Sequence, residues 1–163
     1  MKHLMTTAAI AALSIAAYAD KAVDLIKRYE DFRPSVYICQ AGVKAIGYGF
    51  TSADMIVKGY VSREDADREL TRLCEEIRQK LRRELQDVRL TEAEEAALIS
   101  LIYNVGWRRY RASTIHRKIR QGIRGSEVAE EIRKWVYVTK DGRKVKSKGL
   151  QKRRLSEALI FEQ

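Results

Sequence analysis

Three short runs in the first third of this 163-residue chain decide its fold. They are Leu25-Ile26-Lys27-Arg28-Tyr29-Glu30, Tyr37-Ile38-Cys39-Gln40-Ala41-Gly42-Val43 and Ile46-Gly47-Tyr48-Gly49. In and before the first run, the apolar residues at positions 22, 23, 26 and 29 recur at helical spacing. Pro34 prevents a helix from continuing far beyond Asp31. We therefore expect Glu30 to lie at the end of a helix that begins near Asp20.

The other two runs predict a small sheet. Residues 36–61 are rich in β-branched and aromatic side chains, and glycines at positions 42, 47, 49 and 59 interrupt them. This pattern is typical of short strands joined by tight turns. Asp141-Gly142 predicts one more tight turn near the end of the chain.

The remainder of the chain predicts helices. Apolar residues from Ala66 to Leu85 advance by three or four positions, and Ser62 with Asp65 gives a capping signal, so a long helix is expected over residues 62–86. Thr91 and Glu94 form a capping box before the most apolar helix, which Gly106 can end. Shorter helices are expected over residues 113–121, 126–135 and from about 150. The predicted fold class is α+β, a small sheet inserted among helices.

The composition predicts attraction to polyanions. The formal net charge is +10, from 32 Lys+Arg and 22 Asp+Glu, and the basic residues concentrate in residues 107–124 and 140–154. The partner could be nucleic acid, anionic lipid or the acidic polymers of a bacterial envelope. The alternative is a basic face that has no partner and serves only solubility. The sequence contains no helix-turn-helix, zinc or aromatic-basic motif, so specific nucleic-acid binding is the weakest alternative.

The cysteines and histidines do not predict a metal site or a cofactor. Cys39 and Cys74 match no metal-binding spacing, and His3 and His116 lie in no cluster of ligands. We expect two free thiols, with a disulfide as the alternative.

The first 19 residues form a separate apolar segment. Residues 4–19 are rich in alanine and end in Ala17-Tyr18-Ala19, a small-x-small pattern that precedes Asp20. A signal peptide, a signal anchor with transient membrane contact through residues 4–19, or a helix packed on the domain would each fit. We expect export to the periplasm or cell wall, with cytoplasmic storage until holin-mediated release as the alternative.

The three opening runs resemble the start of glycoside hydrolase family 24, the phage lysozymes and endolysins. Further runs follow in that family's order: Ala97–Gly106, Ser113-Thr114, Arg133-Lys134-Trp135, and Gly149-Leu150 with Arg153-Arg154 and Glu157. The resemblance covers about residues 22–161. It implies a monomeric, lysozyme-like domain over residues 20–163, in which a small antiparallel sheet lobe is inserted in a mainly helical domain.

The resemblance also implies an activity. Members of the family hydrolyse the β-1,4 bond between N-acetylmuramic acid and N-acetylglucosamine in bacterial peptidoglycan, within a cleft between the two lobes. The reaction needs an acid for the leaving oxygen and a second group that steers water. Glu30 matches the acid, and Cys39 matches a position that the family fills with Asp or Cys.

Four positions depart from the family pattern. Lys44 stands where an aromatic residue is frequent, and Asp31 replaces the common glycine after Glu30. Ala45 stands where the family has a threonine that holds the attacking water, and Phe50 stands where histidine is common. Three outcomes are therefore open: slow hydrolysis, an anhydro-forming transglycosylase reaction that needs no water, or a silent pseudo-lysozyme that binds glycan or has a structural role.

Six further residues are candidates for substrate binding, each with a structural alternative. Tyr48 and Gly49 either line the cleft or are required by the geometry of a turn. Asn104 either contacts sugar or caps its helix. Ser113 and Thr114 are N-cap residues that also have a chance of facing the cleft. Arg153, or its neighbour Arg154, pairs with Glu30 or lies on the surface. Beyond peptidoglycan, anionic cell-envelope polymers are the expected partners.

Overall fold

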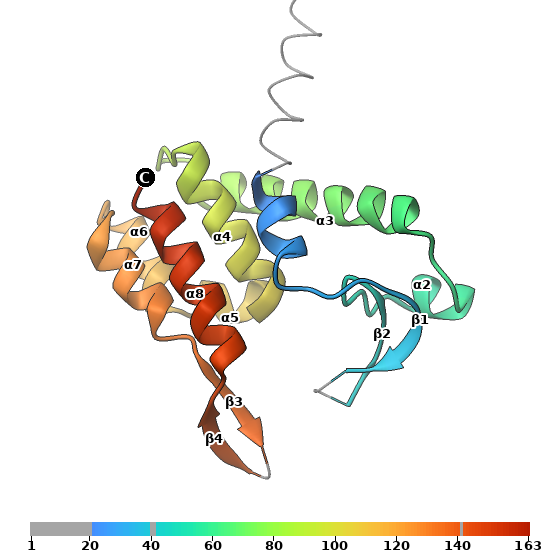
Figure 1. Cartoon of the computed structure of the whole chain (residues 1–163). Helices are drawn as coiled ribbons and strands as arrows, with labels where there is room; N and C mark the ends of the chain where they lie inside the picture. The colour runs from blue at the N-terminus through green and yellow to red at the C-terminus, as the bar shows by residue number, and fades with distance from the viewer. Residues whose placement is uncertain (1–20, 40–41, 141) are drawn as a thin grey trace, which may run out of the picture.

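The computed structural model describes residues 21–39, 42–140 and 142–163. Residues 21–27 are helical and lead to Glu30. The elements that follow are β1 (Arg33–Ile38), β2 (Lys44–Gly47), α2 (Ala53–Lys58), α3 (Arg63–Glu84), α4 (Glu92–Val105), α5 (Trp107–Arg111), α6 (Thr114–Arg120), α7 (Ser126–Arg133), β3 (Tyr137–Lys140), β4 (Arg143–Lys146) and α8 (Lys148–Phe161) (Figure 1). The α+β class predicted from the sequence is confirmed.

The small sheet lies where the glycine-rich runs predicted it. Strands β1 and β2 pair antiparallel, with Tyr37 opposite Ala45, and Ser35 forms an isolated bridge to Tyr60. The expectation of strands throughout residues 36–61 was wrong for residues 53–58, which form α2. Its Ile56 and Val57 favour strands, but Asp54 in the first turn and Lys58 in the last turn complement a helix dipole, and Gly59 ends the helix at φ 71°.

A second sheet was not predicted. Strands β3 and β4 pair antiparallel on either side of the Asp141-Gly142 turn, of which Gly142 has φ 74° and Asp141 lies outside the described residues. The sequence identified this turn but not its strands, because lysine and arginine fill positions that apolar residues occupy in a typical strand.

The capping signals act as expected. The Ser62 hydroxyl accepts the backbone N–H of Asp65 at 3.0 Å at the start of α3. At the start of α4, Thr91 accepts the N–H of Glu94 at 3.1 Å, and the Glu94 carboxylate accepts the N–H of Thr91 at 2.8 Å. Gly106 ends α4 with φ 86°. The last helix begins at Lys148, two residues before the expected start.

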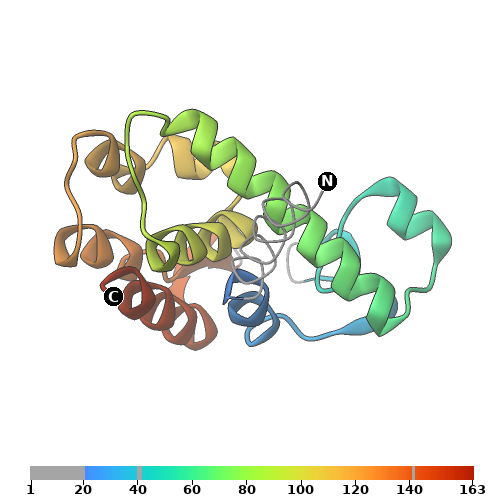
Figure 2. The same cartoon turned by 90° about the horizontal axis from the view of Figure 1, so that it is seen from above.

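The apolar residues form two clusters, which α3 connects (Figure 2). The helical cluster gathers side chains of α3 to α8, including Leu81, Leu98 and Phe161. The sheet-side cluster joins Ile26 of the first helix, Ile46 of β2 and Leu70 of α3. Ile77, midway along α3, packs against both clusters. The two cores are the two lobes that the family resemblance implies.

Within the part of the chain that the structure describes, no helix is both long and apolar enough to cross a membrane. The segment at residues 4–19, for which membrane contact was expected, lies outside the described residues, as does the boundary at residue 19.

Candidate active site

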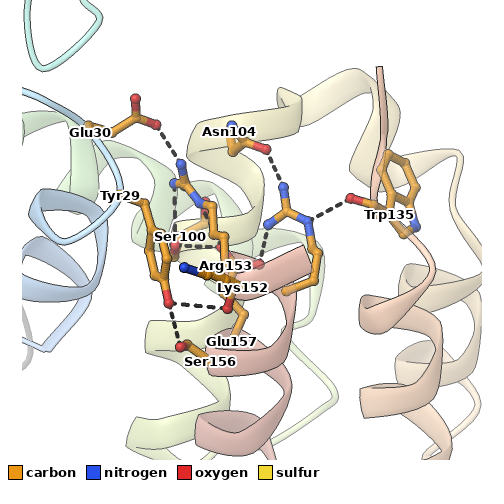
Figure 3. A network of polar contacts seen from close by, with 10 residues as sticks. Tyr29, Glu30, Ser100, Asn104, Trp135, Lys152, Arg153, Ser156 and Glu157 are labelled. Carbon is orange, nitrogen blue, oxygen red and sulfur yellow. Dashed lines mark hydrogen bonds and ion pairs between the residues drawn. The ribbon is translucent and has the colours of Figure 1, made fainter. Parts of the chain in front are cut away.

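Glu30 lies three residues beyond the first helix, where the two lobes meet. Its backbone N–H still bonds to the carbonyl of Ile26 at 2.9 Å, which continues the helical path and fixes the direction of the side chain. The carboxylate is 25% exposed, and its Oε1 lies 2.5 Å from Nη1 of Arg153 in α8 (Figure 3). Glu30 is thus a partly accessible carboxylate joined to a cation from the opposite lobe.

Arg153 is held rigidly from the protein side. Its side chain is 3% exposed, its Nε donates to Glu157 Oε1 at 3.0 Å, and its Nη2 donates to the carbonyl oxygen of Ser100 at 3.2 Å. A buried guanidinium with several fixed acceptors keeps its remaining N–H groups in one direction. Here that direction is toward Glu30.

Glu157 is the fully buried centre of the same network. Its two oxygens accept from Arg153, from Arg154 Nη1, and from the Ser100 hydroxyl at 2.7 Å. Two buried guanidinium groups thus share one buried carboxylate, and Arg153 also contacts Glu30. Such a network stabilises a defined geometry more than it stabilises the fold, because removing four charges from water is costly.

Arg154 ties the network to two further elements. Its Nε donates to the carbonyl oxygen of Trp135 at 3.1 Å, and its Nη2 donates to Oδ1 of Asn104. Burial lowers the pKa of Arg154, against the opposing effect of Glu157. Asn104 is exposed, and its side-chain oxygen is engaged by Arg154, whereas Gly106 ends the helix that Asn104 was expected to cap.

The sheet lobe brings Gly49 to the other side of Glu30. A Cβ built at residue 49 would lie 3.8 Å from Glu30 Oε2, and Gly49 has φ 90°, a conformation that L residues rarely adopt. Tyr48 is buried instead: its hydroxyl donates to Asp67 at 2.8 Å, and its carbonyl accepts from the hydroxyl of Tyr103 at 2.9 Å. Tyr48 therefore positions the loop, and the backbone at Gly49 is the part close to the carboxylate.

Two tyrosines near Glu30 were not among the predicted site residues. Burial, followed by the negative charge of Glu30, raises the pKa of Tyr37 in β1, and the same two causes raise the pKa of Tyr103 in α4. Both belong to the family-like runs, which was the available signal, but an aromatic residue in an apolar run usually packs in a core.

The two positions expected to handle water differ in their surroundings. Cys39 is half-buried, and its backbone N–H bonds to Val43 O at 2.9 Å in the turn after β1. Ala45 is only 1% exposed and lies opposite Tyr37 in the β1–β2 pair. Both cysteines are free thiols, as expected, and burial raises the pKa of Cys74 to about 12.

Ser113 and Thr114 are engaged locally. The Ser113 hydroxyl donates to Tyr110 O at 2.6 Å and accepts from the N–H of His116 at 3.2 Å, as the N-cap of α6. The Thr114 hydroxyl accepts from Arg117 at 3.2 Å. None of these bonds links either residue to Glu30, so their predicted contact with substrate stays a prediction.

The described residues contain no group of three or more His, Cys, Asp or Glu side chains arranged to hold a metal ion. The Glu30 carboxylate is surrounded by the fixed cation of Arg153, by the backbone at Gly49 and by the tyrosines Tyr37 and Tyr103. This set is suited to proton transfer and to binding a polar, hydroxyl-rich ligand.

Comparison with known proteins shows that the chain is similar to bacteriophage enzymes. The family model for phage lysozyme matches residues 27–157. The endolysin of Acyrthosiphon pisum secondary endosymbiont phage 1 is 31% identical over 144 residues, which are 88% of this chain and 97% of that protein. A SAR-endolysin of Bacteriophage PS119 is 33% identical over 115 residues, 68% of this chain and 62% of that protein.

A solved structure agrees with these sequence matches. The endolysin from Escherichia coli O157:H7 phage FAHEc1 superposes with a TM-score of 0.73 at 30% identity, over 86% of this chain and 90% of that one. The family match extends from the residues before Glu30 to Glu157, and so it includes both carboxylate partners of Arg153. The chain belongs to the phage lysozyme family.

Proposed function

We propose that Glu30 is the general acid with which this peptidoglycan-cleaving glycoside hydrolase protonates the leaving oxygen of the β-1,4 bond between N-acetylmuramic acid and N-acetylglucosamine. The observation that supports this role is the pairing of a 25% exposed carboxylate with an almost completely buried arginine at the meeting of the two lobes. Arg153 is a positioning residue in this mechanism, because it orients the carboxylate through a 2.5 Å contact.

Glu157 supports this arrangement from the protein side. It accepts the Nε of Arg153 at 3.0 Å, so that the guanidinium presents a fixed N–H group to Glu30. Backbone at Gly49 approaches the other oxygen, Oε2, without a side chain that would block a sugar.

Activation of the attacking water is the less well supported half of the reaction. The methyl group of Ala45 is buried and offers no hydrogen bond, and Cys39 is the remaining candidate beside the sheet. General acid–base assistance is worth roughly 10²–10⁴-fold for each well-placed group, so loss of one such group leaves slow cleavage by Glu30. An anhydro-forming reaction, in which a hydroxyl of the sugar replaces water, fits the same set of residues.

A second candidate function is glycan binding without catalysis, and Ala45 is the observation that favours it. The discriminating experiment measures muropeptide release from purified peptidoglycan by the unaltered protein, Glu30→Gln, Ala45→Thr and the matched control Asp31→Asn. Asp31 is the exposed neighbouring carboxylate.

We expect measurable release by the unaltered protein and by Asp31→Asn, a loss of at least about 10²-fold in Glu30→Gln, and faster release by Ala45→Thr. An inert protein in which Ala45→Thr restores cleavage would identify a silenced site. The mass of the product separates the two reactions, because an anhydro-sugar is lighter than the hydrolysis product by one water.

We also propose that the protein acts outside the cytoplasm, with residues 4–19 as a signal or signal anchor. The similarity to a SAR-endolysin supports this route. Intact mass after expression in an export-competent bacterium would show whether the chain is cut between Ala19 and Asp20.

A further inference from the structure

The hairpin of β3 and β4 projects from the body of the protein. Every residue of both strands is exposed, including the large apolar side chains of Tyr137, Val138 and Val145. In Figure 1 the hairpin extends from the lower end of α8, on the same side of the molecule as β1 and β2. It is a two-stranded ribbon that contributes no residue to the buried clusters.

The charge of the hairpin is unusual for such a ribbon. Lys140 lies directly opposite Arg143, and like charges directly opposite each other destabilise an antiparallel pair. Lys144 and Lys146 add two more cations, of which Lys146 lies 5.9 Å from the ring centre of Tyr137. Among the described residues, no carboxylate forms an ion pair with any of the four. A two-stranded hairpin is marginally stable in water, so this arrangement does not serve its own folding.

The base of the hairpin is connected to the candidate active site. Trp135 lies just before β3, and its carbonyl oxygen accepts the Nε of Arg154 at 3.1 Å. Arg154 shares Glu157 with Arg153, which contacts Glu30 (Figure 3). On the other side, the N–H of Ser147 after β4 bonds to Val136 O at 2.8 Å. The network that orients Glu30 therefore also fixes where the cationic ribbon begins.

We propose that the β3–β4 hairpin binds the free carboxylates of the peptide side chains of the peptidoglycan strand whose glycan lies against Glu30. The inference rests on the proposed function, because it assigns the partner of that same site. Peptidoglycan carries carboxylates on short peptides that are attached to its sugars. The cations of the hairpin, which begins beside the network around Glu30, complement such carboxylates. Tyr137, Val138 and Val145 supply apolar contact for the same peptides. Anionic lipid headgroups are the competing source of negative charge.

The test compares two variants with equal loss of charge. The first replaces the hairpin cations with glutamine: Lys140→Gln, Arg143→Gln, Lys144→Gln and Lys146→Gln. The matched control replaces four exposed cations remote in sequence from the hairpin: Lys58→Gln, Lys80→Gln, Arg83→Gln and Arg89→Gln. Circular dichroism checks the fold of both, and the double variant Lys144→Gln/Lys146→Gln is a milder form of the first.

Binding is measured by co-sedimentation, and every variant also carries Glu30→Gln so that cleavage of the peptidoglycan does not affect the result. The probes are insoluble peptidoglycan, the same material with its carboxylates converted to amides, and vesicles of anionic lipid. Because exposed ion pairs are individually weak, the loss of four of them predicts a decrease of about tenfold in affinity for unmodified peptidoglycan. We expect that loss in the hairpin variant, a smaller loss in the double variant and in the control, and no difference between variants on the amidated material.

Three results would overturn the inference: an equal loss in the control variant, an equal loss on amidated peptidoglycan, or a hairpin effect confined to the lipid vesicles. The assay does not depend on catalysis. If the unaltered protein releases no muropeptides, the proposed cleavage fails, while the binding result still decides the role of the hairpin.

Discussion

At the scale of single residues, the candidate site is organised around Glu157, a fully buried carboxylate. Glu157 accepts from both Arg153 and Arg154, and only Arg153 reaches Glu30. The sequence analysis identified Glu30 and offered Arg153 or Arg154 as its partner, and the structure shows Arg153. The sequence did not identify Glu157 as their shared acceptor, because its spacing to each arginine is also that of ordinary surface ion pairs on a helix.

The substitution Glu157→Gln keeps the shape and removes the charge. Arg153 would then lose the charged acceptor that lies 3.0 Å from its Nε, while its contact with Glu30 would remain. Because a displaced general acid loses its alignment with the leaving oxygen, we expect the rate of cleavage to fall by up to about 10²-fold. Breaking the buried pair should also lower the free energy of unfolding by about 3–5 kcal/mol.

The rate of muropeptide release from peptidoglycan measures this effect, with Glu162→Gln, a partner of Arg133 at the end of α8, as the control. An unchanged rate in a folded but less stable variant would show that Glu157 acts only on stability.

At the scale of elements, prediction succeeded where the signals are local. The caps of α3 and α4 depend on side chains three residues apart, and the sequence identified both. It failed for α2, where Ile56 and Val57 have strand propensity, and for β3 and β4, where exposed cations conceal the alternation of a strand. In α2 the hydrogen bonds of a short helix outweigh the strand propensity of its residues, and in β3 and β4 the pairing between strands outweighs the low strand propensity of lysine.

The capping box of α4 gives a prediction at this scale. Thr91→Ala removes the acceptor of the Glu94 N–H at the start of the helix that carries Ser100 and Asn104. We expect the free energy of unfolding to fall by about 1 kcal/mol and the melting temperature by about 2–4 °C. Thr71→Ala, at an exposed position of α3, is the control and should have less than half that effect. Equal losses in denaturant unfolding of the two variants would refute a special role of the cap.

At the scale of the whole molecule, α3 belongs to both cores. Leu81 lies in the helical cluster and Leu70 and Cys74 in the sheet-side cluster, with Ile77 packed against both. Neither lobe can lose its core without exposing part of the same helix. This coupling was only partly foreseeable, because the apolar stripe of α3 shows that it is buried but not against which partners.

We therefore expect the two lobes to unfold together. Trp107 and Trp135 pack against the helical cluster, so their fluorescence reports that lobe. The buried Cys74 thiol, whose pKa is raised to about 12, reports the sheet-side lobe through its reaction with an alkylating reagent. The midpoints of urea unfolding from the two probes should coincide, and a gap between them would show independent lobes. Cys39→Ser serves as the background, so that Cys74 is the one thiol measured.

The burial of Ala45 has a consequence in genetic terms. Every alanine codon becomes a threonine codon through one change of its first base, so the methyl group at this position and the hydroxyl typical of the family are one point mutation apart. The residue lies in a paired strand opposite Tyr37, so the exchange requires neither a new loop nor a new fold. Under the proposed mechanism, one point mutation at this codon would therefore change the rate of peptidoglycan cleavage.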